Sequence, residues 1–186
     1  ALDPDTLLAW EMNGEPLPTG HGAPIRAVVP GWYATDSVKW LASIELIDRP
    51  FDGPFEAVDY RLPDPNGETH RMTSMPVNAI FTSPADGAEF GNGARTLRGV
   101  AWGGQGGIAR VELSVDASPW EDAQLAPATG PYTLNRWSLR RDLSAGAHEL
   151  AVRATDGTGA TQSETPTWNP QGYGNASVHR IGVVVR

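Results

Sequence analysis

The sequence contains no cysteine. A disulfide framework, a thiolate metal site and a thiol nucleophile are therefore excluded within this chain.

No apolar run approaches the roughly 20 residues that a membrane-spanning helix needs. The first ten residues, ALDPDTLLAW, lack the basic start and long apolar stretch of a signal peptide, and they lack an initiating Met. We therefore expect the chain to begin inside a larger gene product.

Positive charge is also scarce. Lys and Arg number 14 against 22 Asp and Glu, which gives a formal net charge of −8. Binding to DNA or RNA needs a basic face to contact the phosphates, and no dense run of basic residues is present. The composition therefore argues against a nucleic-acid partner. A hydrophobic content of 40% with seven Trp is typical of a folded globular protein.

The first third of the chain is rich in turn-forming residues. Residues 1–62 contain many Pro and Gly, with strand-like runs only at 25–29 and 38–46. Such a segment buries too little apolar surface to fold alone, so we expect it to pack on further protein or on the C-terminal half. Residues 63–75 are polar and turn-forming, and they are interpreted as a linker.

Residues 76–186 have the pattern of an antiparallel β-sandwich. Apolar and polar side chains alternate in residues 108–115 and 148–154, as they do in half-buried strands. Gly-containing turns separate about seven such runs, which is typical of an immunoglobulin-like fold. The expected strands are 77–82, 96–102, 108–115, 120–125, 132–139, 148–155 and 178–185.

Three basic side chains stand close together in the irregular segment. His21, Arg26 and Lys39 lie among glycines, which let backbone N–H groups approach a ligand closely. Arg binds phosphate or carboxylate oxygens in a fork, whereas Lys acts as a compact point charge. The pattern indicates an anion site. In the alternative interpretation, Arg26 and Lys39 are solvated strand residues and His21 caps a turn.

Four short motifs in this segment carry a family resemblance. MNGEPLP, GHGAPIR, VVPG and SVKW occur in that order between residues 12 and 40. They resemble the end of the molybdopterin domain of sulfite oxidases and assimilatory nitrate reductases. The later sequences WNPQG and NASVHR resemble the dimerisation domain of the same family.

The resemblance implies a fold, a cofactor and a partner. Residues 1–62 would be the end of the α+β molybdopterin-binding domain, and 76–186 the immunoglobulin-like dimerisation domain of a homodimer. His21, Arg26, Ser37, Val38 and Lys39 would bind the molybdenum–molybdopterin cofactor, mainly at its phosphate and its polar pterin edge. The family chemistry is a two-electron reaction at molybdenum with oxygen-atom transfer to or from a small sulfur compound or oxyanion.

The sequence departs from the family in what it lacks. The family ligates molybdenum with a Cys thiolate, the soft donor such a metal prefers, and this chain has none. We therefore expect no metal ligand and no catalytic residue in this chain, and no activity from it alone.

A haem-attachment signature is excluded because it also requires Cys, so the electron partner is open. By analogy with bacterial relatives, the parent protein is expected outside the cytoplasmic membrane.

Gln171 is the candidate for substrate choice. In sulfite oxidases the corresponding loop places an Arg two residues after its Asn, and the resemblance assigns that Arg to the anionic substrate. Here Gln171 occupies the position, and a neutral amide cannot neutralise a dianion. The alternative is that Gln171 is an ordinary surface-loop residue.

The three histidines outside the anion site are not expected to carry chemistry. His70 and His148 are expected to be exposed and inert, and His179 to make a structural hydrogen bond. The alternative function for the whole chain is a non-catalytic immunoglobulin-like module that binds a partner or itself.

Overall fold

A computed structural model describes residues 3–64, 66–104 and 106–186. By its internal contacts the chain forms two compact units. The first comprises Ala1–Met75 together with Asn169–Gly174, and the second comprises Pro76–Trp168 and Asn175–Arg186. Residues 63–75, interpreted above as a linker, contain strand β6 (Thr69–Arg71) and belong to the first unit.

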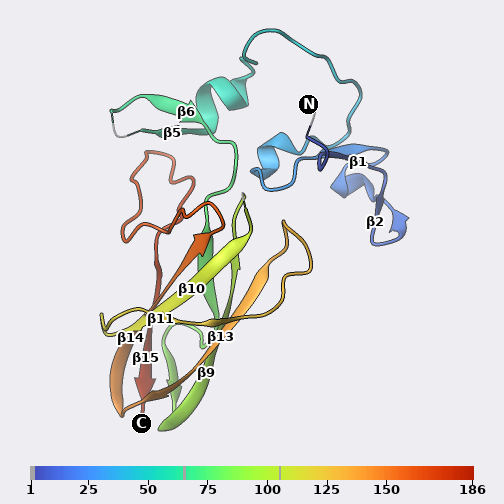
Figure 1. The fold of residues 1–186 in the computed structure, drawn as a ribbon. Helices are drawn as coiled ribbons and strands as arrows, with labels where there is room; N and C mark the ends of the chain where they lie inside the picture. Colours follow the sequence, from blue (N-terminus) through green and yellow to red (C-terminus); the bar gives the residue numbers. More distant parts are fainter. Residues whose placement is uncertain (1–2, 65, 105) are drawn as a thin grey trace. The chain divides into compact units, whose positions relative to one another are not determined.

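The second unit is a sandwich of two sheets (Figure 1). One sheet has the strand order β11-β10-β14-β15-β8 and the other β12-β13-β9-β7. All pairings are antiparallel except that of β8 with β15, which is parallel. The strands are β7 (Asn78–Ser83), β8 (Ala88–Phe90), β9 (Gly93–Trp102), β10 (Ile108–Val115), β11 (Glu121–Asp122), β12 (Gln124–Leu125), β13 (Asn135–Leu143), β14 (Gly146–Asp156) and β15 (His179–Val185). The mainly-β prediction is confirmed.

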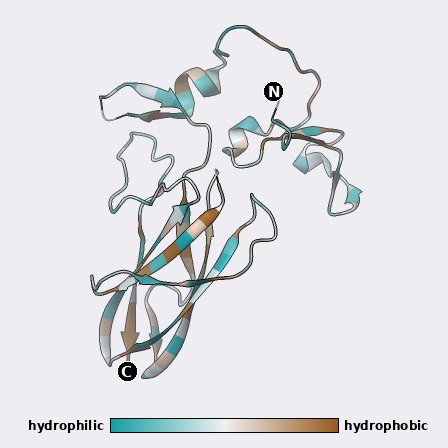
Figure 2. Ribbon diagram, viewed as in Figure 1, coloured by the Kyte–Doolittle hydropathy of each residue, from teal (hydrophilic) through white to brown (hydrophobic). Residues whose placement is uncertain are grey.

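The core lies between the two sheets and is built from alternate residues of their strands. Leu97 and Leu150 are fully buried, and Trp137 is 2% exposed. Phe81 meets Trp137 edge-on, with ring centroids 5.3 Å apart, a geometry worth about 1 kcal/mol beyond area burial. Hydrophobic and hydrophilic colours alternate along strands of the sandwich in Figure 2. Period-two patterning therefore predicted the strands because one face of each sheet is buried.

Two details of the sandwich differ from the prediction. The run at 120–125 forms β11 and β12, which belong to opposite sheets. β8 was not predicted, because three residues between turns carry no measurable alternation.

The first unit consists of short hairpins and single helical turns. β1 (Leu7–Ala9) pairs with β4 (Arg26–Val28), β2 (Glu11–Met12) with β3 (Glu15–Pro16), and β5 (Arg61–Pro63) with β6. The turn of the β2–β3 hairpin is Asn13-Gly14, both at positive φ, as a two-residue hairpin turn requires. Thr19–His21 (η1) and Ala34–Asp36 (η2) are 3₁₀ turns, and Phe55–Asp59 (η3) is a single π turn.

The prediction of a strand at 38–46 was wrong. The structure has no strand between residues 38 and 46. Three residues of this run bind a neighbouring backbone: Val38 accepts from Ala27 N–H, Trp40 N–H donates to the Gly22 carbonyl, and Leu41 N–H donates to the Ile25 carbonyl. Farther along, Ile44 and Leu46 are 66% and 81% exposed. An apolar run becomes a strand only where another strand pairs with it.

No helix among residues 3–64, 66–104 and 106–186 has the length and apolar character to cross a membrane.

Candidate functional site

A glycine-rich turn begins the candidate site. Pro18 enters η1, which ends at Gly22 with φ +109°, a left-handed conformation that favours glycine. A Cβ on Gly22 would lie 3.0 Å from Cβ and Cγ of Lys39, so the turn lies directly against the Lys39 backbone and side-chain base. The imidazole of His21 is exposed at the end of this turn.

Arg26 joins the turn to a second segment. Its Nη1 donates to the carbonyl of His21 at 3.1 Å and its Nη2 to the carbonyl of Ser37 at 3.4 Å. The third nitrogen, Nε, is buried and has no hydrogen-bond partner among the described residues. Buried polar groups nearly always have a partner, and an unmet one costs about 1–3 kcal/mol. The guanidinium is therefore held in place by two backbone carbonyls, while its Nε–H lacks a partner.

The segment 37–41 runs beside the turn and completes the cluster. Ser37 Oγ accepts from Val29 N–H at 3.1 Å, and the Val38 carbonyl accepts from Ala27 N–H at 2.8 Å. Lys39 Nζ donates to the Gly20 carbonyl at 3.0 Å. The structure thus brings together Ser37, Val38 and Lys39 with the turn that carries His21 and with Arg26. Val38 can contribute only its backbone, since its side chain is apolar and 50% exposed.

The sequence did not identify Trp40 as a residue that positions the site. Its Nε1 donates to the Thr19 carbonyl at 2.9 Å, and the Lys39 ammonium lies 5.6 Å from its ring centre. Its φ is +52°, an uncommon conformation for a residue other than glycine. The motif SVKW contained the residue, but no sequence pattern shows which backbone carbonyl an indole N–H will reach.

The site is electropositive although the chain is acidic. Neither Arg26 nor Lys39 forms an ion pair with a carboxylate within the described part of the chain. The nearest acid in sequence, Asp36, is paired with Arg71. Burial raises the pKa of Asp36, and the Arg71 charge opposes this shift. The uncompensated cations can therefore hold an anion.

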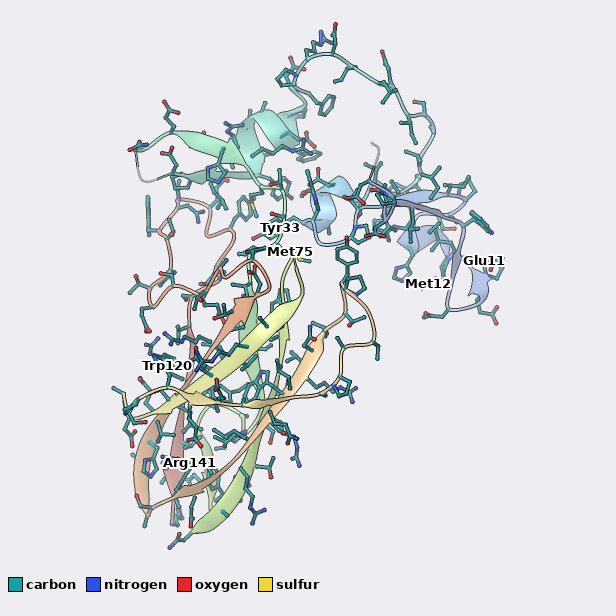
Figure 3. The ribbon with its side chains drawn as sticks, in the orientation of Figure 1. Glu11, Met12, Tyr33, Met75, Trp120 and Arg141 are labelled. Carbon is teal, nitrogen blue, oxygen red and sulfur yellow. The ribbon has the colours of Figure 1, made fainter. Side chains whose placement is uncertain are left out.

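A backbone ladder attaches this segment to the end of the first unit. Tyr33 N–H donates to the Thr73 carbonyl and Met75 N–H to the Gly31 carbonyl, both at 2.9 Å. Tyr33 and Met75 accordingly lie side by side in Figure 3. Burial raises the pKa of Tyr33, so its hydroxyl stays protonated at neutral pH.

Gln171 lies in a closed loop that belongs to the first unit. Asn169, only 7% exposed, accepts from Tyr173 N–H at 3.0 Å and donates to the Tyr173 carbonyl at 2.8 Å. The Tyr173 ring packs 5.1 Å from that of Tyr60. The loop is thus fixed at both ends, and Gln171 is exposed at its tip.

Outside the Arg26–Lys39 cluster, the described residues offer no metal site, and His179 has a structural role. No group of three or more His, Asp or Glu side chains in the described chain could hold a metal ion. His179 Nδ1 accepts from Phe81 N–H at 3.3 Å, which confirms the expected structural hydrogen bond. Burial lowers the pKa of His179, which favours the neutral ring this bond needs.

Two family models match the chain. Residues 1–55 match the oxidoreductase molybdopterin binding domain, and residues 69–186 match the Mo-co oxidoreductase dimerisation domain.

Curated relatives match over the whole chain. Mitochondrial sulfite oxidase of Homo sapiens is 34% identical over 205 residues, covering 100% of this chain and 38% of the human protein. Sulfite oxidase of Arabidopsis thaliana is 34% identical over 200 residues, covering 95% of this chain and 51% of the plant protein. The chain therefore spans between about two fifths and one half of the length of these relatives.

A solved structure shares the fold. The sulfane dehydrogenase SoxCD of Paracoccus pantotrophus superposes with a TM-score of 0.85 at 30% identity, covering 95% of this chain and 48% of that chain.

Proposed function

The chain belongs to the sulfite-oxidase-like family of molybdopterin oxidoreductases, and on that premise we propose that its first unit binds the phosphate of the molybdopterin cofactor. In this proposal Arg26 and Lys39 provide the charge, His21 a further donor, and Ser37 and Val38 the backbone that positions them. The parent enzyme oxidises or reduces a small sulfur compound or oxyanion.

The observation that carries the proposal is the unmet Nε–H of Arg26. Its two Nη groups are already directed by backbone carbonyls, so the side chain cannot turn away from a ligand without losing both bonds. A guanidinium edge meets two phosphate oxygens well, and charge-assisted bonds of this kind are worth about 1.5–3 kcal/mol each. The residues present therefore fit an anionic group.

Each part of the chain has a separate task in this account. When bound, molybdenum supplies two-electron chemistry with oxygen-atom transfer. Arg26 and Lys39 retain the cofactor, and the Gly20–Gly22 turn allows its close approach. The sandwich joins two protomers, most simply about a two-fold axis. A purely adhesive module has no use for the cation cluster, so the non-catalytic alternative is not favoured.

Substrate choice is proposed to depend on Gln171. Hydrogen bonds between Asn169 and Tyr173 close the loop, so the position of Gln171 between them is restricted. An amide there can donate a hydrogen bond but adds no positive charge. The parent enzyme is therefore expected to handle sulfite poorly or to prefer another sulfur substrate.

The proposal is tested on the purified full-length protein. We expect stoichiometric molybdenum by elemental analysis, pterin fluorescence after oxidative release, and substrate-dependent reduction of an artificial electron acceptor. Protein that is folded and dimeric, expressed in a host that makes the cofactor, but free of molybdenum and pterin would contradict it.

A further inference from the structure

The outer face of the β12-β13-β9-β7 sheet carries a cluster of arginines. Arg98 of β9 is directly opposite Ser138 of β13, and Arg136 and Arg140 lie two residues to either side of Ser138. Leu97 and Trp137, one position away on the two strands, are buried in the core. Side chains alternate along a strand, so all three arginines point to solvent on the same face.

The three arginines are close neighbours on the sheet. Four residues of antiparallel strand separate the Arg136 and Arg140 Cα atoms by about 13–14 Å, and Arg98 lies between them on the next strand, about 5 Å across. Diagonal neighbours in such a pair are about 7–8 Å apart. We call Arg98, Arg136 and Arg140 the arginine face.

Among the residues that the structure describes, no carboxylate forms an ion pair with these three arginines. Asp142 is the one acidic residue at the outward positions of β7, β9, β12 and β13, and no ion pair joins it to a described residue. The other arginines of the sandwich, apart from Arg95, each pair with a carboxylate: Arg110, Arg141, Arg153, Arg180 and Arg186. Within the sandwich, unpaired positive charge is thus concentrated on this face and at Arg95, in a chain of net charge −8.

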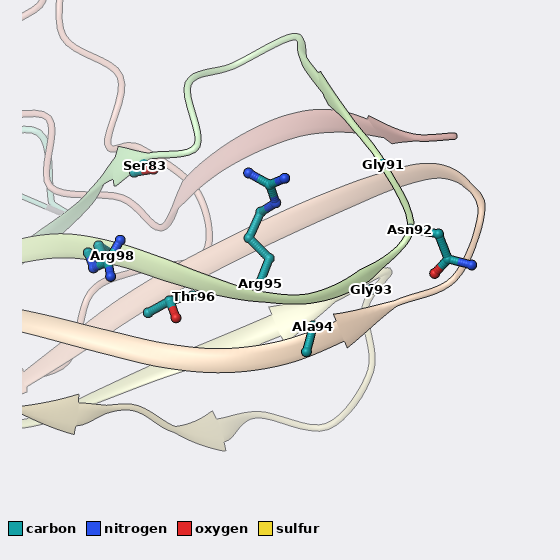
Figure 4. Close-up of a pocket in the computed structure, with 8 residues that line it drawn as sticks. All are labelled: Ser83, Gly91, Asn92, Gly93, Ala94, Arg95, Thr96 and Arg98. Carbon is teal, nitrogen blue, oxygen red and sulfur yellow. The ribbon is translucent and has the colours of Figure 1, made fainter.

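A cavity of about 330 Å³ adjoins the arginine face. Its lining includes Arg95, Thr96 and Arg98 of β9, and Ser83, which lies opposite Arg98 in register (Figure 4). β7 pairs with β9 only from Arg98 onward, whereas β13 pairs with all of 93–101. Residues 93–97 therefore have an open backbone edge on the cavity side within the described chain. Arg95 stacks on Phe90 with 3.9 Å between its guanidinium carbon and the ring centre, which holds it at this opening.

We propose that the arginine face and this cavity bind an acidic segment of a partner protein. Carboxylates along such a segment bridge Arg98 to Arg136 or Arg140, and its end enters the cavity, where Ser83 and Thr96 hydroxyls donate hydrogen bonds. Attraction between unlike charges also speeds the encounter and depends on salt.

Other occupants fit less well. A second copy paired about a two-fold axis that passes through this face would place arginines against arginines, which repel one another. A nucleic acid would gain only a few phosphate contacts while the rest of an acidic chain repels it.

The test uses fluorescence anisotropy with a labelled peptide of alternating Glu and Thr, added to the 186-residue chain at low and high salt. The test variant is the triple Arg98→Glu, Arg136→Glu, Arg140→Glu. Its matched control, with the same change of net charge, is the triple Arg141→Glu, Arg180→Glu, Arg186→Glu. Replacing the arginine face with three Gln repeats the test with less perturbation, and circular dichroism verifies each fold.

We expect salt-sensitive binding that weakens at least about ten-fold in both arginine-face variants and little in the control. Binding that survives the arginine-face variants, or is absent from the parent chain, overturns the proposal. So does equal binding of a polyphosphate of matched charge. Loss of self-association in the arginine-face variants, seen by sedimentation, would instead assign this face to contacts between copies and would also overturn it.

Discussion

The imidazole of His148 lies 2.7 Å from Asp116, across 32 residues of sequence. Nδ1 faces the Asp116 carboxylate, and Nε2 faces the Ser144 carbonyl at 2.8 Å. The other Asp116 oxygen accepts from Glu149 N–H at 2.8 Å. The His148 side chain is only 10% exposed, so the expectation that it is exposed was wrong. With acceptors on both ring nitrogens, the protonated ring is the form that fits.

This pair predicts a pH dependence of stability. The hydrogen bond to Asp116, followed by that to Ser144, raises the pKa of His148, and the bond from His148 lowers the pKa of Asp116. The His148 contribution is complete below about pH 6.5 and is lost as pH rises through the higher folded pKa. The Asp116 contribution is present above about pH 4 and is lost as pH falls through the lower folded pKa. The pair therefore stabilises most at about pH 4–6.5.

His148→Gln should accordingly lower the melting temperature more at pH 5.5 than at pH 9. Asp116 is 51% exposed, so screening limits the effect to about 1 kcal/mol, or roughly 2–4 °C. Thermal unfolding at the two pH values measures the difference. An equal loss at both would show that the ring acts only by packing.

Glu112 is predicted to contribute more than an ordinary surface acid. Its side chain is 6% exposed, and its oxygens lie 3.0 Å from Arg153 Nε and 3.1 Å from Arg110 Nη2. Arg153 also stacks on Trp120, which is labelled in Figure 3, with 4.2 Å between its guanidinium carbon and the ring centre. Glu112→Gln should lower the free energy of unfolding by about 1–3 kcal/mol.

The matched control is Glu121→Gln, which removes the 44%-exposed partner of Arg141 and should cost under about 1 kcal/mol. Urea unfolding compares the two variants. Equal losses would mean that burial of Glu112 adds nothing.

Gly99 is predicted to be irreplaceable in the core. A Cβ at this position would lie 2.0 Å from the Ile80 carbonyl oxygen and 2.1 Å from the Trp137 ring. Neither the backbone nor the enclosed indole can move far, so Gly99→Ala should destabilise by about 3 kcal/mol or prevent folding. Gly182→Ala, where the nearest atom is 3.8 Å away, should be neutral or slightly stabilising. Denaturant midpoints of the two would separate steric conflict from a general effect of added methyl groups.

Gln171→Arg is expected to improve sulfite binding by the full-length enzyme. One added charge-assisted contact corresponds to a roughly ten-fold to hundred-fold lower KM. Steady-state assays with sulfite measure it, and Gln171→Met controls for side-chain size without charge. A tight sulfite KM in the parent enzyme, unchanged by the Arg, would show that this loop does not govern substrate choice.

The sandwich was predictable because its strands are half-buried. The buried inward residues Val111 and Leu113 of the first run and Leu150, Val152 and Ala154 of the second are apolar, and the observed strands β10 and β14 cover both runs. The prediction of a strand at 38–46 was wrong because this run does not pair with another strand. Apolar residues indicate that a segment tends to be buried. A strand also needs a neighbouring strand to pair with, and the sequence pattern does not show which segments pair.

Site chemistry was only partly readable from the sequence. The spacing of Arg26 and Lys39 among glycines indicated an anion site, but the carbonyls that orient them come from tertiary structure. The arginine face could not be predicted from the sequence. Arg98 and Arg136 are 38 positions apart and become neighbours only through the register of β9 with β13.

The central claim is that Arg26 retains the cofactor through its phosphate. The most direct measurement is the molybdenum and pterin content of full-length Arg26→Ala protein beside the parent and an Arg49→Ala control, which removes an exposed arginine of the same unit. Losing charge-assisted bonds worth about 1.5–3 kcal/mol should weaken retention roughly ten-fold to hundred-fold, with the control unchanged and both variants folded. Equal molybdenum and pterin content in Arg26→Ala and parent protein after extensive dialysis would contradict the account.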